Sequence, residues 1–275
     1  MATSEFIQPK LALTFNQAKA SLPVQIFLVT WRNLVTIFRT PAALLPPMAI
    51  SIFFLVIYDS TLGKASSFIP NIGGSYLGFI LPLSIVSSSL SGAGIAAQNL
   101  VRDIQSGYFD KLLLTPISRG ALLLGPILAG AVILGIQASV VVGIALLLGL
   151  EPVTGGTGLL AVIGLAILLG TGFAGFTVSA ALGSGSAAAT QGASFIFFPL
   201  TFLAPTFVPL EFLDGWLKTA AKLNPITYVL EAMRATINSG WDAQLMWNGV
   251  FACLALGTLM YILAVLALRT RTRRV

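Results

Sequence analysis

Residues 102–119 read RDIQSGYFDKLLLTPISR and carry five charges in an otherwise apolar part of the chain. No charged residue lies between Lys64 and Arg102, and none lies between Arg119 and Glu151. Uncharged stretches of about 20 residues are what a hydrocarbon layer of about 30 Å selects. The charged island must therefore lie in water, between two segments that cross a membrane. Its pattern predicts a short amphipathic helix that Pro116 ends.

The composition supports the same conclusion for the whole chain. Of the 275 residues, 56% are hydrophobic and 9% are charged, whereas a soluble domain has about 25% charged residues. The chain contains no His, which excludes imidazole catalysis, and one cysteine, Cys253, which excludes a disulfide or a cysteine-built metal site. The net charge of +6 is scattered rather than gathered on one face, so nucleic acid is not an expected partner. The sequence predicts an all-α integral membrane protein.

Six membrane-spanning helices are expected from length and lack of charge. Their predicted ranges are 42–58, 76–97, 121–150, 158–182, 188–208 and 247–268, within one membrane domain over 41–268. The fifth carries Pro199, Pro205 and Pro209, and a proline so deep in a span frees backbone carbonyls that protein or water must satisfy.

The lysines and arginines predict the orientation. With both termini cytoplasmic, eleven of the fifteen basic residues face inside, and Lys64, Lys218, Lys222 and Arg234 remain outside. We therefore expect a multi-pass protein of the inner (plasma) membrane, with the 102–119 island, an N-terminal tail (1–22) and a basic tail (269–275) in the cytoplasm. The start MATSEFIQPK lacks the pattern of a cleaved signal peptide.

An amphipathic helix is predicted over 23–40, before the first span. Its apolar residues recur at helical spacing, while Arg32, Asn33 and Arg39 lie off that face, which favours a helix in the cytoplasmic interface. The stripe consists of Phe27, Trp31, Leu34, Val35 and Phe38. The alternative is that this stretch forms the first turns of the first span.

Two short helices that dip into the outer membrane interface are expected between the fifth and sixth spans. One has an apolar face around Trp216, and the other follows Asn224-Pro225. On the second helix, Glu231 and Arg234 are three residues apart and could pair, or they could act in gating or substrate release.

Two sets of residues in the spans could line a translocation path or serve in packing. Small polar residues follow one another on the second span, and aromatic residues surround the prolines of the fifth. The candidates are Ser84, Ser88 and Ser91 in the second span and Phe198 and Phe202 in the fifth.

The chain lacks the motif by which many ATPases hold phosphate. Its only Gly-Lys pair, Gly63-Lys64, is followed by Ala65 rather than Ser or Thr. No catalytic residues and no cofactor are expected in this chain, which is predicted not to be an enzyme. The scarcity of ionisable residues within the spans counts against a proton- or sodium-coupled carrier.

Two motifs carry a family resemblance. The island, with Ser106-Gly107 and the run 112–119 (LLLTPISR), resembles the cytoplasmic loop of ABC-2 type permeases, the membrane subunits of ATP-binding-cassette exporters. The stretch Leu223-Asn224-Pro225-Ile226-Thr227-Tyr228, continuing to Arg234, also resembles that family. The likeness is strongest to the branch that exports drugs and lipids. Tyr108-Phe109 departs from the pattern, since many members have a Thr and an acidic residue there.

This resemblance implies a permease that dimerises with a second copy or a paralogue and is driven by separate ATPase subunits, which bind ATP and Mg²⁺. The 102–119 helix would be the coupling helix, and the 23–40 helix would be the connecting helix beside it. The substrate would be amphipathic or lipid-like, and membrane lipids would surround the spans. The resemblance implies that Phe109, Leu112 and Leu113 are apolar anchors for the ATPase, with a polar rim of Arg102, Asp103, Asp110 and Lys111. Gly107 and Pro116 would break the helix at its two ends. A non-ABC carrier or channel is the alternative.

Overall fold

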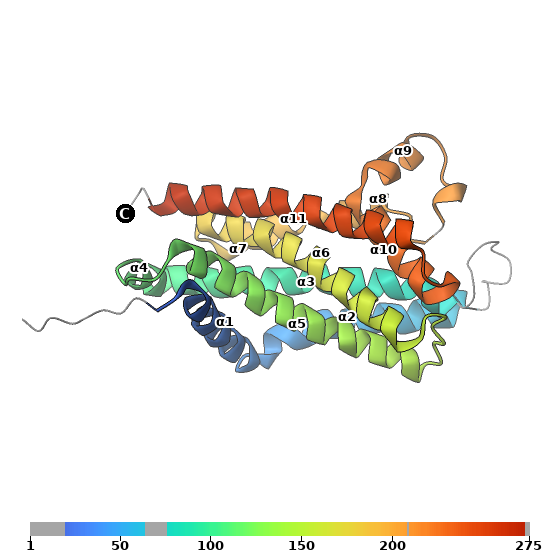
Figure 1. Cartoon of the computed structure of the whole chain (residues 1–275), viewed down its shortest axis with the longest axis horizontal. Helices are drawn as coiled ribbons and strands as arrows, with labels where there is room; N and C mark the ends of the chain where they lie inside the picture. Colours follow the sequence, from blue (N-terminus) through green and yellow to red (C-terminus); the bar gives the residue numbers. More distant parts are fainter. Residues whose placement is uncertain (1–19, 64–75, 208, 273–275) are drawn as a thin grey trace, which may run out of the picture.

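A computed structural model describes residues 20–63, 76–207 and 209–272, which form an elongated bundle of helices (Figure 1). No strand occurs among these described residues. The elements are α1 Leu22–Phe38, α2 Pro41–Leu62, α3 Tyr76–Gln105, α4 Tyr108–Leu113, α5 Arg119–Leu147, α6 Gly155–Ser184, α7 Ala187–Ser194, α8 Phe197–Leu203, the 3-10 turn η2 Leu210–Phe212, α9 Gly215–Leu223, α10 Pro225–Arg234, the π-helical turn η3 Ala235–Ser239 and α11 Ala243–Thr272.

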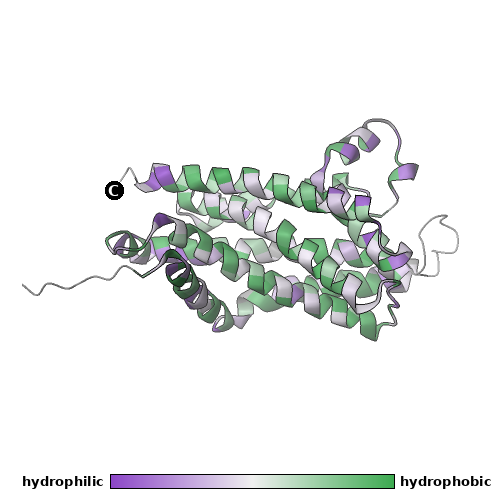
Figure 2. Cartoon of the chain, in the orientation of Figure 1, coloured by the Kyte–Doolittle hydropathy of each residue, from purple (hydrophilic) through white to green (hydrophobic). Residues whose placement is uncertain are grey.

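Five of the described helices are long and apolar enough to cross a membrane, namely α2, α3, α5, α6 and α11. Figure 2 shows hydrophobic residues along the middle of the bundle and hydrophilic residues concentrated toward its two ends. The start of α1, α4 and the end of α11 lie at one end, called the α4 end below, while α9 and α10 lie near the other, called the α10 end (Figure 1). The protein is therefore an all-α integral membrane protein, as predicted.

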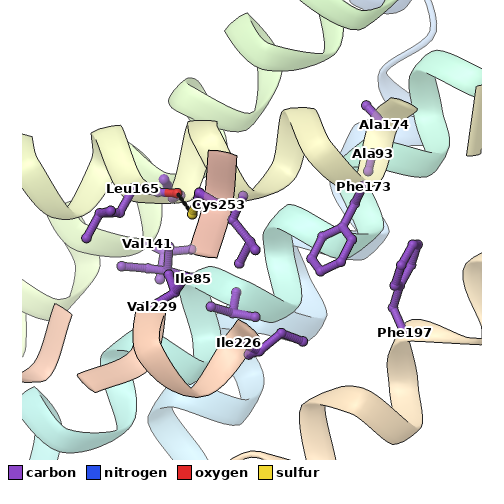
Figure 3. Packing of buried hydrophobic residues seen from close by; sticks show 14 of the residues in the cluster. Ile85, Ala93, Val141, Leu165, Phe173, Ala174, Phe197, Ile226, Val229 and Cys253 are labelled. Carbon is purple, nitrogen blue, oxygen red and sulfur yellow. Dashed lines mark hydrogen bonds between the residues drawn. The ribbon is translucent and has the colours of Figure 1, made fainter. Parts of the chain in front are cut away.

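The core forms where α3 packs against α5 and α6, and α3 is the most buried of the long helices. Figure 3 shows Ile85 of α3 near Val141 of α5, with Ile226 and Val229 of α10 packed against the same centre. The rings of Phe173 on α6 and Phe197 on α8 are 4.1 Å apart between centroids. By contrast, α2 and α11 expose most of their apolar side chains, as helices facing lipid or another protein do.

The fifth predicted span, 188–208, is wrong as a single helix. The chain forms two short helices instead, α7 and α8, interrupted at Phe195 and Ile196. Pro199 explains the break, because it cannot donate a hydrogen bond to the carbonyl of Phe195 and its ring collides with that carbonyl. After α8, Ala204 is extended, as a residue before a proline prefers. Residue 208 lies outside the described residues.

Two predicted boundaries also change at the α4 end. α3 continues past residue 97 to Gln105, and α11 continues past residue 268 to Thr272, so part of the predicted basic tail is helical. The hydrophobic pattern marks where a helix leaves the apolar layer, whereas its backbone hydrogen bonds continue until a glycine or another terminating residue stops them. α1 covers nearly the predicted range of 23–40.

Close packing of α6 against α11 depends on glycines. A Cβ atom added at Gly172 would lie 3.2 Å from the Cα atom of Gly257, and backbone cannot move aside as a side chain can. We expect Gly172→Val to destabilise the protein by about 1–3 kcal/mol, the usual range for overpacking. Gly164→Val in the same helix is the matched control, since no atom lies within 4 Å of its added Cβ. Equal melting temperatures of the two variants in detergent would contradict this account.

Candidate functional site

The charged island does not form one helix. Arg102 and Asp103 belong to the last turn of α3, and α4 is a separate helix of six residues. Gly107 turns the chain between them with φ = 70°, a conformation that favours glycine because it has no Cβ. Ser118 then caps α5 by accepting a hydrogen bond from the backbone N–H of Ala121. A helix over the whole of 102–119 is therefore wrong, but a short helix does lie between Gly107 and Pro116, and the island reverses the chain at one end of the bundle.

Phe109 is not available to a partner. The structure leaves it 2% exposed in the core, and the guanidinium carbon of Arg271 lies 5.9 Å from its ring centroid. Its predicted role as an apolar anchor for another protein is therefore wrong. Arg271 also donates a hydrogen bond to the carbonyl of Leu182, so α4, α6 and α11 meet around Phe109.

The exposed surface of the island is called the α4 tip here and consists of Tyr108, Lys111, Leu114, Thr115 and Pro116. Leu114 is 86% exposed, which is unusual for an apolar side chain, and the sequence analysis did not single it out. The signal was present in the run Leu112-Leu113-Leu114, but which leucine points outward depends on where the helix begins. Leu112 and Leu113 are only partly exposed and pack against the core. Asp110 is half-buried on the same helix.

Arg32 of α1 connects α1 to both α3 and α4 at the α4 end of the bundle. Its two terminal nitrogens each donate a hydrogen bond of 2.6 Å to the carboxylate oxygens of Asp103. Its guanidinium carbon also lies 4.1 Å from the ring centroid of Tyr108. The hydrogen bond to Asp103 raises the pKa of Arg32, which keeps the guanidinium charged at any physiological pH. This is the only ion pair among the described residues.

The predicted faces of α1 require one correction. Arg32 and Asn33, expected off the apolar face and in water, instead face the protein, and Asn33 is buried. The aromatic side chains of Phe27, Trp31 and Phe38 are more than half exposed, and the first two stack with centroids 6.4 Å apart. The side chain of α1 residue Gln25 accepts a hydrogen bond from the backbone N–H of Ser118, so α1 also lies beside the island.

A cavity of about 470 Å³ runs along one side of α3, a size that suits a small-molecule ligand. Its walls come from α2, α3, α7, α8 and the segment after α8, and they are mostly apolar. The lining residues used below are Phe54, Tyr58, Ser84, Asn99, Arg102, Gln98, Gln191, Phe198, Phe202 and Phe207.

Only some of the residues predicted to line a translocation path lie on the wall of this cavity. Ser84, Phe198 and Phe202 line the cavity. Ser88 is buried and does not line this cavity, so its assignment to a path stays a prediction. The side chain of Ser91 lies outside the described residues. Arg102, predicted to contact a partner protein, lines the cavity instead.

At the α10 end, Arg234 is 9% exposed and donates hydrogen bonds to the backbone carbonyls of Phe79, Pro205 and Thr206. Burial lowers the pKa of Arg234 to about 9, so the side chain still carries its charge at neutral pH. The predicted pair with Glu231 is wrong, because Glu231 forms no ion pair with any described residue. Burial raises the pKa of Glu231, although the nearby charge of Arg234 opposes that rise.

Asn224 and Pro225 begin α10, as the sequence pattern indicated. The side-chain oxygen of Asn224 accepts from the backbone N–H of Ile226, and its amide donates to the carbonyl of Leu200 on α8. The apolar face of α10 packs into the core of the bundle, which corrects the expectation that this helix dips into the membrane interface. α9 is the more exposed of the two, with Trp216 75% exposed.

Comparison with known proteins places these features in a family. The model of the family described as "ABC-2 type transporter" matches residues 24–238, which is well over half of the chain. "Daunorubicin resistance ABC transporter permease protein DrrB1" of Streptomyces coeruleorubidus is 26% identical, over 87% of this chain and 83% of its own length. "Probable doxorubicin resistance ABC transporter permease protein DrrC" of Mycobacterium tuberculosis is 25% identical over 78% of each chain. "Putative transport permease ycf38" of Porphyra purpurea is 26% identical, over 88% of this chain and 84% of its own.

These matches agree with the position of the island between two long helices, with the short helices before the last one, and with the missing phosphate-binding motif. They exclude the alternative of a non-ABC carrier or channel. ATP is hydrolysed by a separate subunit in such transporters, so this chain is not an enzyme. The chain belongs to the ABC-2 type transporter family and is a membrane permease of an ABC exporter.

Proposed function

We propose that this permease couples to its ATPase subunit through the α4 tip and moves an amphipathic substrate along the cavity beside α3. The observation that carries the proposal is the exposure of Leu114, which is 86% solvent-accessible at the centre of the charged island. An apolar side chain rimmed by polar groups is typical of a surface that another protein covers.

The chemistry of the α4 tip suits a groove on a soluble protein. Leu114 supplies an apolar anchor, Lys111 supplies a charge beside it, and Pro116 fixes the chain where α4 has ended. A lever must also be stiff, and α4 is held from behind by the buried ring of Phe109. A push on the tip would therefore move α4 as a unit rather than bend it.

The push would reach the membrane helices by two routes. The first is covalent, through Gly107 into α3 and through Ser118 into α5. The second is the contact of Arg32 with both Asp103 and Tyr108, which ties α1 to the island. Since α1 leads directly into α2, movement of the island would shift both α2 and α3, the helices on either side of the cavity.

The cavity supports an amphipathic or lipid-like substrate, because most of its walls are apolar and it lies beside lipid-facing helices. α2, α8 and the turn before α8 expose large apolar side chains around it, among them Ile50, Phe53, Phe195 and Phe198. We assign this surface to a second permease copy or a paralogue, which would close the path from the open side. Membrane lipids would cover the outer surface of α11.

The orientation follows from the basic residues. The α4 end would face the cytoplasm, where an ATPase subunit holding ATP and Mg²⁺ can reach it, and the α10 end would face outward. This arrangement puts both termini in the cytoplasm and the protein in the inner (plasma) membrane.

Leu114→Asp is expected to break the contact with the ATPase subunit. Burial of a leucine contributes about 1.5–3 kcal/mol, and a buried unpaired carboxylate costs more, so recovery of the complex should fall about tenfold or further. The measurement is the amount of ATPase that copurifies with the tagged permease from native membranes, identified by its phosphate-loop sequence. ATP-driven export should fall with it.

Leu147→Asp is the matched control, because Leu147 is 87% exposed but lies at the α10 end. This variant should retain the ATPase. If Leu114→Asp retains as much ATPase and as much export as Leu147→Asp, the α4 tip is not the docking surface. Phe109→Ala cannot serve this purpose, because its first effect would be a hole in the core.

A further inference from the structure

The two ends of the cavity differ in chemistry. Toward the α10 end the walls are aromatic, with Tyr58 stacked on Phe54 at 5.6 Å and edge-on to Phe207 at 5.4 Å between centroids. Phe202 lies between Phe198 and Phe207, at 4.8 and 6.2 Å. Toward the α4 end the walls carry amide and guanidinium groups. The lining is therefore amphiphilic along its length.

Arg102 supplies an uncompensated positive charge at the polar end. It is an exposed residue that lines the cavity, and its side chain forms no ion pair or hydrogen bond with any other described residue. None of the described residues that line the cavity is an Asp or a Glu. The neighbouring Asp103 is committed to Arg32, with both carboxylate oxygens in use. A cation left in this way attracts an anion from outside the chain.

Asn99, three residues before Arg102 on α3, provides a second and independent observation. It is 8% exposed, it lines the same end of the cavity, and its buried side-chain nitrogen has no hydrogen-bond partner among the described residues. A buried donor without an acceptor costs about 1–3 kcal/mol, so an acceptor from a ligand would stabilise it. Gln98 beside it already donates to Gln191, at 3.0 Å, which leaves Asn99 and Arg102 as the open groups.

We propose that Arg102 and Asn99 form a head-group site for an amphiphile with an anionic head group, whose apolar tail lies against the aromatic end of the cavity. This inference rests on the proposed function and adds the charge and direction of the substrate. Residues from Leu83 to Arg102 line the cavity along α3, a length of about 28 Å at a rise of about 1.5 Å per residue. That length suits a long acyl chain, and the site lies where the cytoplasmic leaflet would supply one.

The charge of Arg102 argues against a second permease copy, or a cationic amphiphile, as the occupant of this cavity. A second permease copy could cover the apolar walls, but the only acidic residue of α2 and α8 is Asp59, which lies next to Tyr58 of the aromatic end rather than near Arg102. A cationic amphiphile would have to place its charge beside the guanidinium, which is unfavourable in a partly enclosed site.

The test compares three probes that share an oleyl tail: oleate, 1-oleoyl lysophosphatidate and oleylamine. Each competes with a fluorescent fatty acid for the purified full-length permease in an uncharged detergent. The anions are expected to bind about tenfold or more tightly than the amine, the ratio that one charge-assisted hydrogen bond supplies. Tighter binding of the lysophosphatidate would identify a phospholipid as the source of the head group, whereas tighter binding of oleate would identify a free fatty acid.

Arg102→Gln should reduce the preference for the anions to about twofold or less, and Arg102→Glu should reverse it toward oleylamine. Arg269→Gln is the matched control, since it removes an equal charge from an exposed position at the same end but outside the cavity. It should leave the preference unchanged. Because Arg102 is exposed and unpaired, its variants should fold, which their elution profiles in detergent will report.

Equal binding of oleate and oleylamine to the wild-type permease would overturn the inference, as would an unchanged preference in Arg102→Glu. If Arg269→Gln reduced the preference for the anions as much as Arg102→Gln does, the inference would also be overturned, because the effect would then come from the net charge of the surface. These outcomes leave the proposed function intact if the ATPase still copurifies and export still requires ATP. Loss of that copurification in the wild-type protein would instead remove the proposed function.

Discussion

Replacement of Arg234 by methionine is expected to lower the stability of this permease by about 3 kcal/mol or more. The side chain donates hydrogen bonds to three backbone carbonyls, of Phe79, Pro205 and Thr206, and its guanidinium lies 3.7 Å from the ring centroid of Phe79. Methionine has a comparable length but no donor. Each carbonyl left buried without a partner costs about 1–3 kcal/mol.

The reason for the size of this effect is the break in the chain after α8. Pro205 and the extended residue before it prevent a helix from continuing, so the carbonyls of Pro205 and Thr206 have no helical donor. Arg234 satisfies them from α10 and ties the same segment to α3 through the carbonyl of Phe79. It thus replaces the backbone hydrogen bonds that the prolines remove.

The measurement is the melting temperature in detergent, which we expect to fall by roughly 6–12 °C for Arg234→Met. The melting temperature of Arg234→Lys should lie between those of this variant and the wild type, because lysine keeps the charge but cannot reach three acceptors in a fixed plane. Lys222→Met is the control, as an exposed cation at the same end of the bundle. If Arg234→Met has the same melting temperature as Lys222→Met, the three hydrogen bonds of Arg234 do not stabilise the fold.

Loss of Arg234 should also be felt in the cavity, since Thr206 and Phe207 belong to its aromatic end. A loosened segment would move the ring of Phe207 away from Tyr58 and Phe202. Arg234 is therefore a positioning residue for the path, far along the chain from the residues that it positions.

Features that depend on local chemistry could be predicted from the sequence. The long uncharged stretches predicted the crossing helices, because hydrophobicity and length suffice for that purpose. Asn224-Pro225 predicted the start of α10, because a cap and a proline act within one turn. The break after α7 has a local cause as well, since Pro199 acts on the residue four positions before it. From the prolines of this span, the sequence analysis predicted only that backbone carbonyls would be freed.

Features that depend on packing between distant segments could not be predicted. Spacing favoured a pair between Glu231 and Arg234, yet carbonyls from two other segments surround Arg234 in the fold. The same holds for Phe109, whose position on a charged island suggested an exposed anchor. It is buried, with the guanidinium carbon of Arg271 from α11 lying 5.9 Å from its ring centroid, and no local pattern reports such a long-range contact.

Breaking the contact between Arg32 and Asp103 is expected to separate ATP hydrolysis from export. The two side chains are 71 residues apart in sequence and form two parallel hydrogen bonds, each of 2.6 Å. Such a paired geometry fixes the angle of the guanidinium as well as its position. Arg32 is thereby held over the ring of Tyr108, so the pair sets where α4 lies relative to α1.

Asp103→Asn keeps the shape of the side chain but removes its charge and one acceptor. We expect ATP-driven export to fall about tenfold, in line with the loss of a charge-assisted hydrogen bond, because the tip would move without carrying α1 and α2 with it. Copurification of the ATPase should change by less than about twofold, since Leu114 and the rest of the α4 tip remain in place. Reduced export with retained ATPase binding would show that the ATPase still docks on the α4 tip but no longer moves α1 and α2.

A charge swap, Arg32→Asp with Asp103→Arg, tests whether the pair itself matters. It restores opposite charges at the same two positions, so export should recover to several times the level of either single variant. Arg39→Gln is the control, because Arg39 is an exposed basic residue at the C-terminal end of α1. It forms no ion pair with a described residue. A swap that exports no better than the single variants, or an Asp103→Asn variant that loses its ATPase, would show that these residues support the fold or the docking surface rather than the coupling between them.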